Sequence, residues 1–223
     1  GAYATFNCTH YCGDRPESVK ANLEILAASL PKRPQAFVIP RQTHTTNVRV
    51  IKDIPTQETL QDVDAVVTHL KDFCLCVSTA DCVPVLLYDV SKDVLAAIHA
   101  GWRGTVGRIV EKTLEVMESE YGTECKDVIA CIGPSISLES FEVGDEVYAA
   151  FAEAGFEMSC IARKYEKWHL DLWEANRLQL LAHGVLPEHI EVAGICTYQN
   201  YEDFFSARRL GIKSGRILSG IMI

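Results

Sequence analysis

The sequence predicts an α+β fold built of packed layers. Helical and β-rich segments both occur, but they do not alternate regularly as a doubly wound sheet of βαβ units would require. Two β-rich segments, 83–89 and 94–100, lie so close together that they form a hairpin. The chain has 223 residues, 48% of them hydrophobic, and shows no linker-like stretch. We therefore expect a single domain over residues 1–223.

Composition narrows the class of function. The formal net charge is −9 without any basic block, which argues against a nucleic-acid partner. No apolar run approaches the ~18 residues of a membrane span. The nine cysteines in a chain of this length favour reduced thiols over a disulfide framework. We expect a cytoplasmic protein that acts on small molecules, with its oligomeric state open.

The first half of the chain is predicted to be one helix followed by strands. The helix covers residues 13–31, where apolar side chains recur at helical spacing between two prolines. Runs of alternating or β-branched residues predict that the remainder of this half is extended. The expected extended segments are 36–51, 64–70, 73–81, 83–89 and 94–100.

The second half is predicted to mix helices and strands. Thr105 is placed to cap a long amphipathic helix that Gly122 closes. Further helices end at Gly155 and Gly184, and the acidic residues of FEVGDE suit the start of the first of them. The remaining predictions are strands at 128–135, 190–198 and 216–223, with a polar, basic loop at 201–215.

The hairpin carries residues that a hydrophobic hairpin does not need. With the turn centred between Ser91 and Lys92, residue i faces residue 183 − i, so Cys82 opposes Gly101. His99 then lies two residues along on the same face, and such diagonal neighbours are about 7–8 Å apart. A shift of one residue would put the two side chains on opposite faces.

Cysteine and histidine are the ligands that zinc prefers, and catalytic zinc sites combine three protein ligands with an open position. Cys82 and His99 supply two, and we choose His44, in a strand-like segment with polar neighbours, as the third. Gln42 and Asp81 flank these ligands and are predicted to contact substrate, with Asp81 also able to orient a histidine.

The segment GWRGT, residues 101–105, adds a candidate anion site. Its glycines allow close approach of the backbone to a ligand, and free N–H groups at the start of a helix attract negative charge. Arg103 adds a guanidinium suited to phosphate or carboxylate.

Other interpretations of these residues stay open. Cys82 could be a nucleophile without metal, with His99 or His44 as the base and Asp81 or the second histidine as its orienter. The segment 8–12, Cys-Thr-His-Tyr-Cys, is a rival metal cluster that lacks a fourth ligand. A laccase needs many imidazoles for its copper cluster, whereas this chain has seven histidines and no His-x-His pair.

Several blocks together resemble the YfiH-type family, whose members carry the names multicopper polyphenol oxidase (laccase domain), peptidoglycan editing factor and purine nucleoside phosphorylase. The resemblance runs from about Phe6 to the C-terminus. In order along the chain, the blocks are QTH, STADCVPVLLYD, IHAGWRGT, IGPSIS…FEVG, DLWEANR and CTY…FFSARR.

The resemblance implies a layered α/β/β/α domain with mixed sheets. It implies a zinc or copper site on the histidine of QTH, the cysteine of ADC and the histidine of HAGWRG, which are His44, Cys82 and His99. The implied activity is phosphorolysis of adenosine, inosine, guanosine and methylthioadenosine, together with deamination of adenosine. The alternatives are a cysteine amide hydrolase acting on a cell-wall peptide precursor, and a polyphenol oxidase.

Two departures from the family pattern stand out. The family has glycine after the histidine of Q-x-H, whereas this chain has Thr45, which is predicted to narrow the pocket. A T-R-x-G-G-x-S segment precedes the region of residues 1–3 in the family, and we expect it, with its arginine, to be missing here.

Overall fold

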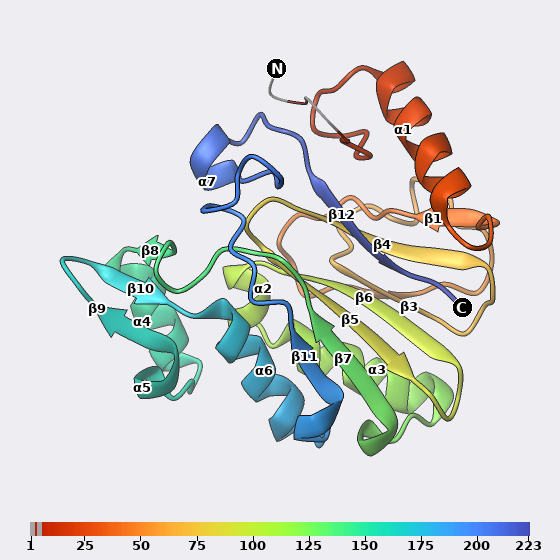
Figure 1. The fold of residues 1–223 in the computed structure, drawn as a ribbon. Coiled ribbons are helices and arrows are strands. Elements are labelled where there is room, and N and C mark those ends of the chain that lie inside the picture. Colours follow the sequence, from red (N-terminus) through yellow and green to blue (C-terminus); the bar gives the residue numbers. More distant parts are fainter. Residues whose placement is uncertain (1–2, 4–5) are drawn as a thin grey trace.

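The structure, a computed structural model, describes residue 3 and residues 6–223. Two β-sheets stack on each other and carry helices on their outer faces, which gives four layers in the order α/β/β/α (Figure 1). The expected α+β class and the layer order are therefore confirmed. The expected loss of a family segment before residue 3 lies outside the described residues.

One of the two stacked sheets has three strands, in the order β1-β4-β12, and we name it the outer sheet. The other has six strands, in the order β11-β7-β5-β6-β3-β2, and we name it the inner sheet. A small sheet, β8-β10-β9, stands apart from both. The strands are β1 (Ala36–Val38), β2 (Val48–Val50), β3 (Ala65–Thr68), β4 (Phe73–Thr79), β5 (Val83–Asp89), β6 (Val94–Ala100), β7 (Val128–Ile132), β8 (Glu142–Val143), β9 (Ala162–Lys164), β10 (Trp168–Leu170), β11 (Ile190–Val192) and β12 (Ile217–Ile221).

Helix α1 covers the outer sheet, while α3 and α6 cover the inner one (Figure 1). The helices are α1 (Pro16–Ser29), α2 (Trp102–Val106), α3 (Ile109–Tyr121), α4 (Asp145–Glu153), α5 (Met158–Ile161), α6 (Leu172–Ala182) and α7 (Ala207–Leu210), with 3-10 turns η1 (Cys125–Asp127) and η2 (Pro187–His189).

Strand alternation explains how one segment serves two layers. In β6, Val94, Ala96 and Ile98 face α3, whereas Leu95 and Ala97 face the outer sheet. The same alternation carries His99 to the face between the two sheets, where apolar packing ends and polar side chains begin.

The predicted hairpin is confirmed in its register. β5 and β6 are antiparallel, with Val83 opposite Ala100 and Pro84 opposite His99, so that paired numbers sum to 183. Most other predicted elements are present with shorter bounds. The predicted strands 64–70 and 73–81 correspond to β3 and β4, which follow each other in the chain but belong to different sheets.

The long helix expected from Thr105 to Gly122 is interrupted, which corrects that prediction. Arg108 has a left-handed backbone (φ 62°) and separates α2 from α3. Thr105 lies buried inside α2 and caps nothing, because Gly101 takes the N-cap position. Gly122 ends α3 in the left-handed conformation, as expected.

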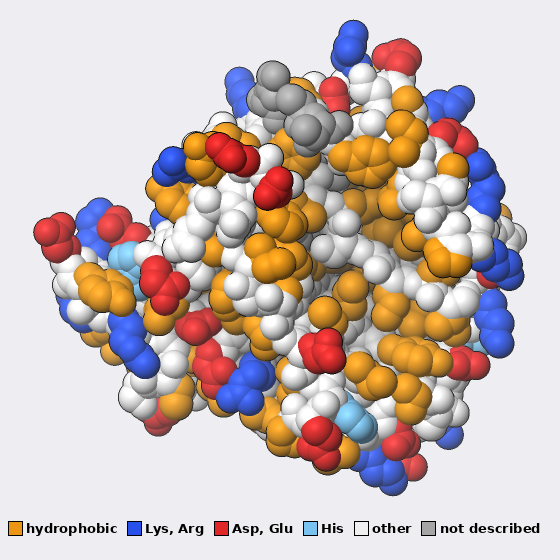
Figure 2. Space-filling model, in the orientation of Figure 1, with side chains coloured by type: hydrophobic (Ala, Val, Ile, Leu, Met, Phe, Trp, Pro, Cys, Tyr) orange, Lys and Arg blue, Asp and Glu red, His pale blue; other side chains and the backbone are white. Residues whose placement is uncertain are grey.

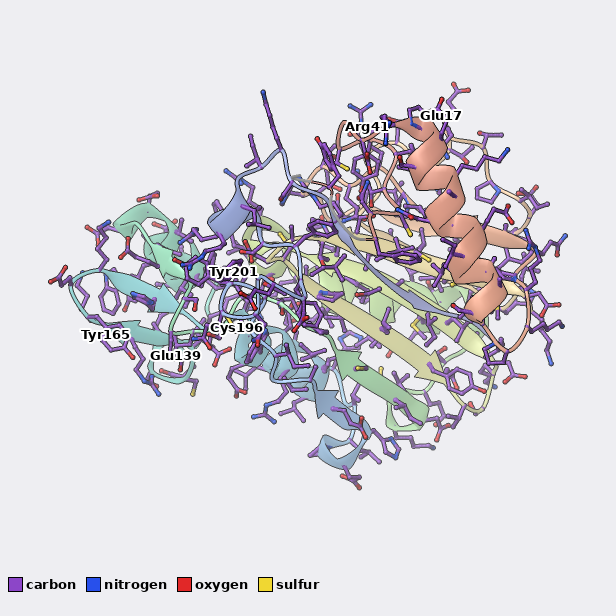
Figure 3. The ribbon with its side chains drawn as sticks, turned by 45° about the horizontal axis from the view of Figure 1, so that its top comes forward. Glu17, Arg41, Glu139, Tyr165, Cys196 and Tyr201 are labelled. Carbon is purple, nitrogen blue, oxygen red and sulfur yellow. The ribbon has the colours of Figure 1, made fainter. Side chains whose placement is uncertain are left out.

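A small lobe formed by α4, α5 and β8–β10 projects from the main body, at the left of Figure 1. Glu139 and Tyr165 lie on this side, and Cys196 lies where the lobe meets the body (Figure 3). The predicted strand 190–198 ends early, at Val192, and its remainder holds only a single bridge between Cys196 and Ser135.

Charged side chains of both signs surround the face in Figure 2, and no extended area of a single sign covers it. Among the described residues, no helix combines the length and apolarity that crossing a membrane demands.

Candidate metal centre

The structure brings Cys82 and His99 together at the open end of the β5–β6 hairpin. Cys82 directly precedes β5, and Asp81 before it has a left-handed backbone (φ 85°) that turns the chain into the strand. His99 is the penultimate residue of β6 and is only 4% exposed. The confirmed register therefore puts sulfur and imidazole on one face.

His44 reaches the same place from the loop between β1 and β2. Its Nε2 is 3.7 Å from the Cys82 sulfur, and its ring centroid is 4.9 Å from that of His99. One ligand atom from each of His44, Cys82 and His99 lies within 4.8 Å of the others. Three side chains far apart in the sequence thus converge on one point.

A buried carboxylate, Asp64, holds the two histidines in place. Its Oδ1 is 2.7 Å from Nδ1 of His99 and accepts the backbone N–H of His44 at 3.0 Å. Its Oδ2 accepts the backbone N–H and the hydroxyl of Thr45 at 2.8 and 2.7 Å. Asp64 is fully buried, so these bonds compensate its charge.

The same bonds explain the unusual backbone of His44. Its φ is 64°, a left-handed value that costs energy for a residue with a Cβ. The carboxylate of Asp64 gathers the N–H groups of Thr43, His44 and Thr45 and so stabilises this conformation. Thr45 is thus one of the groups that neutralise Asp64.

Sequence reasoning missed Asp64. The sequence favours Asp81 for the orienting role, but its carboxylate accepts hydrogen bonds from the Thr197 hydroxyl and the Arg208 backbone N–H instead. In the chain, Asp64 only heads a predicted strand, and neither spacing nor a motif links it to His44 or His99. The one available signal is an acidic residue directly before the apolar run Ala-Val-Val of this strand.

The electrostatics favour a thiolate beside a protonated imidazole when no cation is present. Burial opposes ionisation of Cys82, but the imidazoles of His99 and His44 outweigh it and lower its pKa to about 6. Burial likewise opposes protonation of His99, yet the Cys82 sulfur and the Asp64 carboxylate raise its pKa to about 9.

The donor set fits a tetrahedral divalent ion. Zinc bonds of ~2.0 Å to nitrogen and ~2.3 Å to sulfur would separate two ligand atoms by about 3.5 Å, and the sulfur of Cys82 is 3.7 Å from Nε2 of His44. Because Asp64 occupies Nδ1 of His99, Nε2 of that ring is free for a cation. That the three residues bind a metal stays a prediction.

Gly101, the first glycine of GWRG, lies against this cluster. A Cβ on it would approach His44 Cδ2 to 2.9 Å and the Cys82 sulfur to 3.1 Å. A Cβ on Gly104, the second glycine, would lie 3.4 Å from Ile109 Cγ2 and from the Thr45 carbonyl oxygen, which is ordinary contact. Gly101 therefore leaves room for the ligands themselves.

The three side chains line a cavity of about 240 Å³. Gln42 lies in its wall, with its amide fixed by two 2.7 Å hydrogen bonds to the backbone of Ser78. Tyr11 and Arg216 also line it, so the wall provides a phenol and a positive charge that sequence reasoning did not select. The remaining lining residues are Ser78, Ala80, Ala207 and Ile212.

Arg103 lies elsewhere on α2. It is exposed, and its guanidinium stacks over the Trp102 ring at 4.3 Å. The rival segment 8–12 does not converge on a point. His10 is exposed and bonds Gln57, while Cys12 bonds oxygens of Asn7 and Thr9.

Comparison with known proteins identifies the family. The family model described as multi-copper polyphenol oxidoreductase laccase matches residues 1–223. The chain belongs to this family. A purine nucleoside phosphorylase from Bacteroides thetaiotaomicron is 58% identical, over 100% of this chain and 86% of the relative. A protein named adenosine deaminase RL5, from an unknown prokaryotic organism, is 43% identical over 99% and 87%.

Solved structures agree with the fold. A Bacillus licheniformis hypothetical protein YfiH superposes with a TM-score of 0.93 at 28% identity, covering 99% of this chain and 86% of that one. YlmD from Geobacillus stearothermophilus gives a TM-score of 0.90 at 30% identity, covering 100% and 86%. The resemblance predicted from the sequence blocks is confirmed.

Replacing Asp64 tests its positioning of the histidines. Asp64→Asn removes the charge that orients His99 and gathers the loop at His44, so we expect affinity for Zn²⁺ to fall by about 10–100-fold. Competition with a chromophoric chelator measures it. Asp62→Asn is the matched control, because Asp62 accepts a bond from Thr43 but touches neither imidazole. Equal affinities in the two variants would contradict the assignment.

Replacing Gly101 tests the space beside the ligands. We expect Gly101→Ala to lose bound metal, because the added methyl group displaces His44 or Cys82. Gly104→Ala, in the same helix-loop segment, should keep it. Metal content by mass spectrometry after desalting provides the comparison, with circular dichroism to confirm folding. Full metal content in Gly101→Ala would show that the ligands lie farther from this residue.

The lowered pKa of Cys82 predicts its reactivity in metal-free protein. Below pH 6 the sulfur gains its proton and reacts slowly; above pH 6 it is a thiolate. Alkylation by iodoacetamide should therefore rise from about pH 5 to about pH 7 and then level off. Peptide mass spectrometry distinguishes Cys82 from the exposed Cys160. A rate that climbs until pH ~9, as for an ordinary thiol, would refute the thiolate–imidazolium pair.

Proposed function

We propose that this chain is a zinc-dependent purine nucleoside enzyme, which cleaves adenosine, inosine, guanosine and methylthioadenosine with phosphate and also deaminates adenosine. The convergence of His44, Cys82 and His99 on one cavity carries the proposal. Relatives named for both activities support it. Copper is the alternative metal, in keeping with the family description.

A divalent ion held by His44, Cys82 and His99 would supply Lewis-acid activation of water or of the substrate. The protein prepares this site by keeping Nδ1 of His99 bonded to Asp64, which leaves the opposite nitrogen available. Burial opposes ionisation of Asp64, but its contacts with His99 and Thr45 outweigh burial and lower its pKa, so the carboxylate remains ionised and keeps the ring oriented.

The cavity wall would bind the rest of the substrate. Arg216 would contribute a positive charge suited to phosphate. Its guanidinium is held in place by donating to the backbone carbonyls of Ile212, Ser214 and Gly215. Burial raises the pKa of Tyr11, so its hydroxyl stays protonated at neutral pH and can donate a hydrogen bond. Gln42 is fixed by the Ser78 backbone and presents a rigid surface. That Arg103, at its exposed position on α2, binds phosphate stays a prediction.

Product analysis tests the activity directly. The metal-loaded protein is incubated with adenosine, with and without phosphate, and the products are separated by chromatography. Phosphorolysis yields adenine only with phosphate, whereas deamination yields inosine in both cases. Cys82→Ala should reduce both turnovers by at least about 100-fold. The exposed Cys160→Ala is the matched control and should retain them. Absence of product from protein with stoichiometric zinc or copper would overturn the proposal.

A cysteine amide hydrolase acting on a cell-wall peptide precursor is the second candidate. The observation that favours it is the arrangement of Cys82, His99 and Asp64. The Cys82 thiolate lies beside the His99 imidazole, which the Asp64 carboxylate orients, as in a cysteine nucleophile with its base. The effect of bound zinc on activity distinguishes the two candidate functions. An amide hydrolase of this kind loses activity when zinc occupies Cys82, whereas the nucleoside enzyme requires the metal.

A further inference from the structure

A second group of metal-ligating side chains lies far from the candidate metal centre. Glu118 belongs to the last turn of α3, Cys125 opens η1, and His183 follows α6 as its C-cap. The left-handed Gly122 turns the chain back after α3, which brings Cys125 beside Glu118. These three elements meet at the lower edge of Figure 1, where β7 begins.

The donor atoms of this group are already spaced for one small cation. The Cys125 sulfur is 3.1 Å from Glu118 Oε1, and Nε2 of His183 is 3.5 Å from the same oxygen. All three donors lie within 4.8 Å of one another. Tetrahedral zinc separates its ligand atoms by about 3.3–3.6 Å, which is close to both distances from Glu118 Oε1.

The surroundings of the group are negative. The carboxyl ends of α3 and α6 both point here, and helix carboxyl ends favour cations. Asp89 at the end of β5 is fully buried, and its Oδ2 has no hydrogen-bond partner among the described residues. Burial raises the pKa of Cys125 to about 12, and the charges of Glu118 and Asp89 add to the effect.

We propose that Glu118, Cys125 and His183 form a second binding site for a divalent metal of zinc type. A thiolate, an imidazole and a carboxylate are all zinc ligands, and the partly exposed Glu118 and His183 leave a fourth position for water. Binding replaces the S–H proton of Cys125, which passes to solvent. The bound ion ties the ends of α3 and α6 to the start of β7.

This site is separate from the proposed function. Cys82 precedes β5 and Asp89 ends it, and seven strand residues span about 20 Å. Loss of the second site would therefore leave the first intact. The site carries no substrate and is a stabilising element of the fold.

Cobalt titration of full-length protein tests the proposal. In the His44→Ala/Cys82→Ala variant the first centre is disabled, so any thiolate-to-cobalt charge-transfer band must come from another cysteine. We expect one equivalent of Co²⁺ to produce that band. Adding Cys125→Ser should abolish it, whereas adding Cys131→Ser, at an exposed cysteine of β7, should not.

His183→Gln provides a second variant if Cys125→Ser folds poorly. It removes a ligand that is 20% exposed and should weaken Co²⁺ binding at least about tenfold while leaving the charge-transfer band at saturation. Zinc should raise the melting temperature of the His44→Ala/Cys82→Ala protein but not that of its Cys125→Ser derivative. No band in the folded starting variant, or a band that survives Cys125→Ser, would overturn the proposal.

Discussion

The buried carboxylate of Asp64 is the constraint on which the candidate metal centre depends. It accepts hydrogen bonds from the His99 ring and from successive backbone N–H groups around His44. A buried carboxylate that water cannot reach needs hydrogen-bond donors. Directing the backbone N–H groups around His44 toward Asp64 requires a left-handed backbone at His44. The energetic requirement of one acidic side chain therefore sets the positions of two imidazoles.

The layered fold provides the place where this constraint operates. Between the sheets, Leu75 and Val77 of β4 pack on Leu95 and Ala97 of β6, and the apolar contact ends where His99 begins. The cavity opens at that margin, bordered by β4, the hairpin end and the segment before β12. Gly101 completes it, since a larger residue would occupy the space that His44 and Cys82 share.

The same hairpin separates the two groups of metal-ligating side chains. One gathers where β5 begins and the other near Asp89, where β5 ends. They differ in their electrostatics. At the first, two imidazoles lower the pKa of the cysteine, while at the second, burial and carboxylates raise it. A cation would displace the thiol proton of Cys125 at the second group and the Nε2 proton of the His99 imidazolium at the first.

The sequence by itself determined the strand alternation and the hairpin register that puts Cys82 near His99, because these follow from side-chain periodicity and turn position. For His44 it offered only a suitable ligand type among polar neighbours. It also carried the family resemblance in its short blocks. Tertiary structure alone decided the role of Asp64, the break at Arg108 and the place of Arg216 in the cavity wall. Each depends on contacts between segments distant in the chain, which no local pattern encodes.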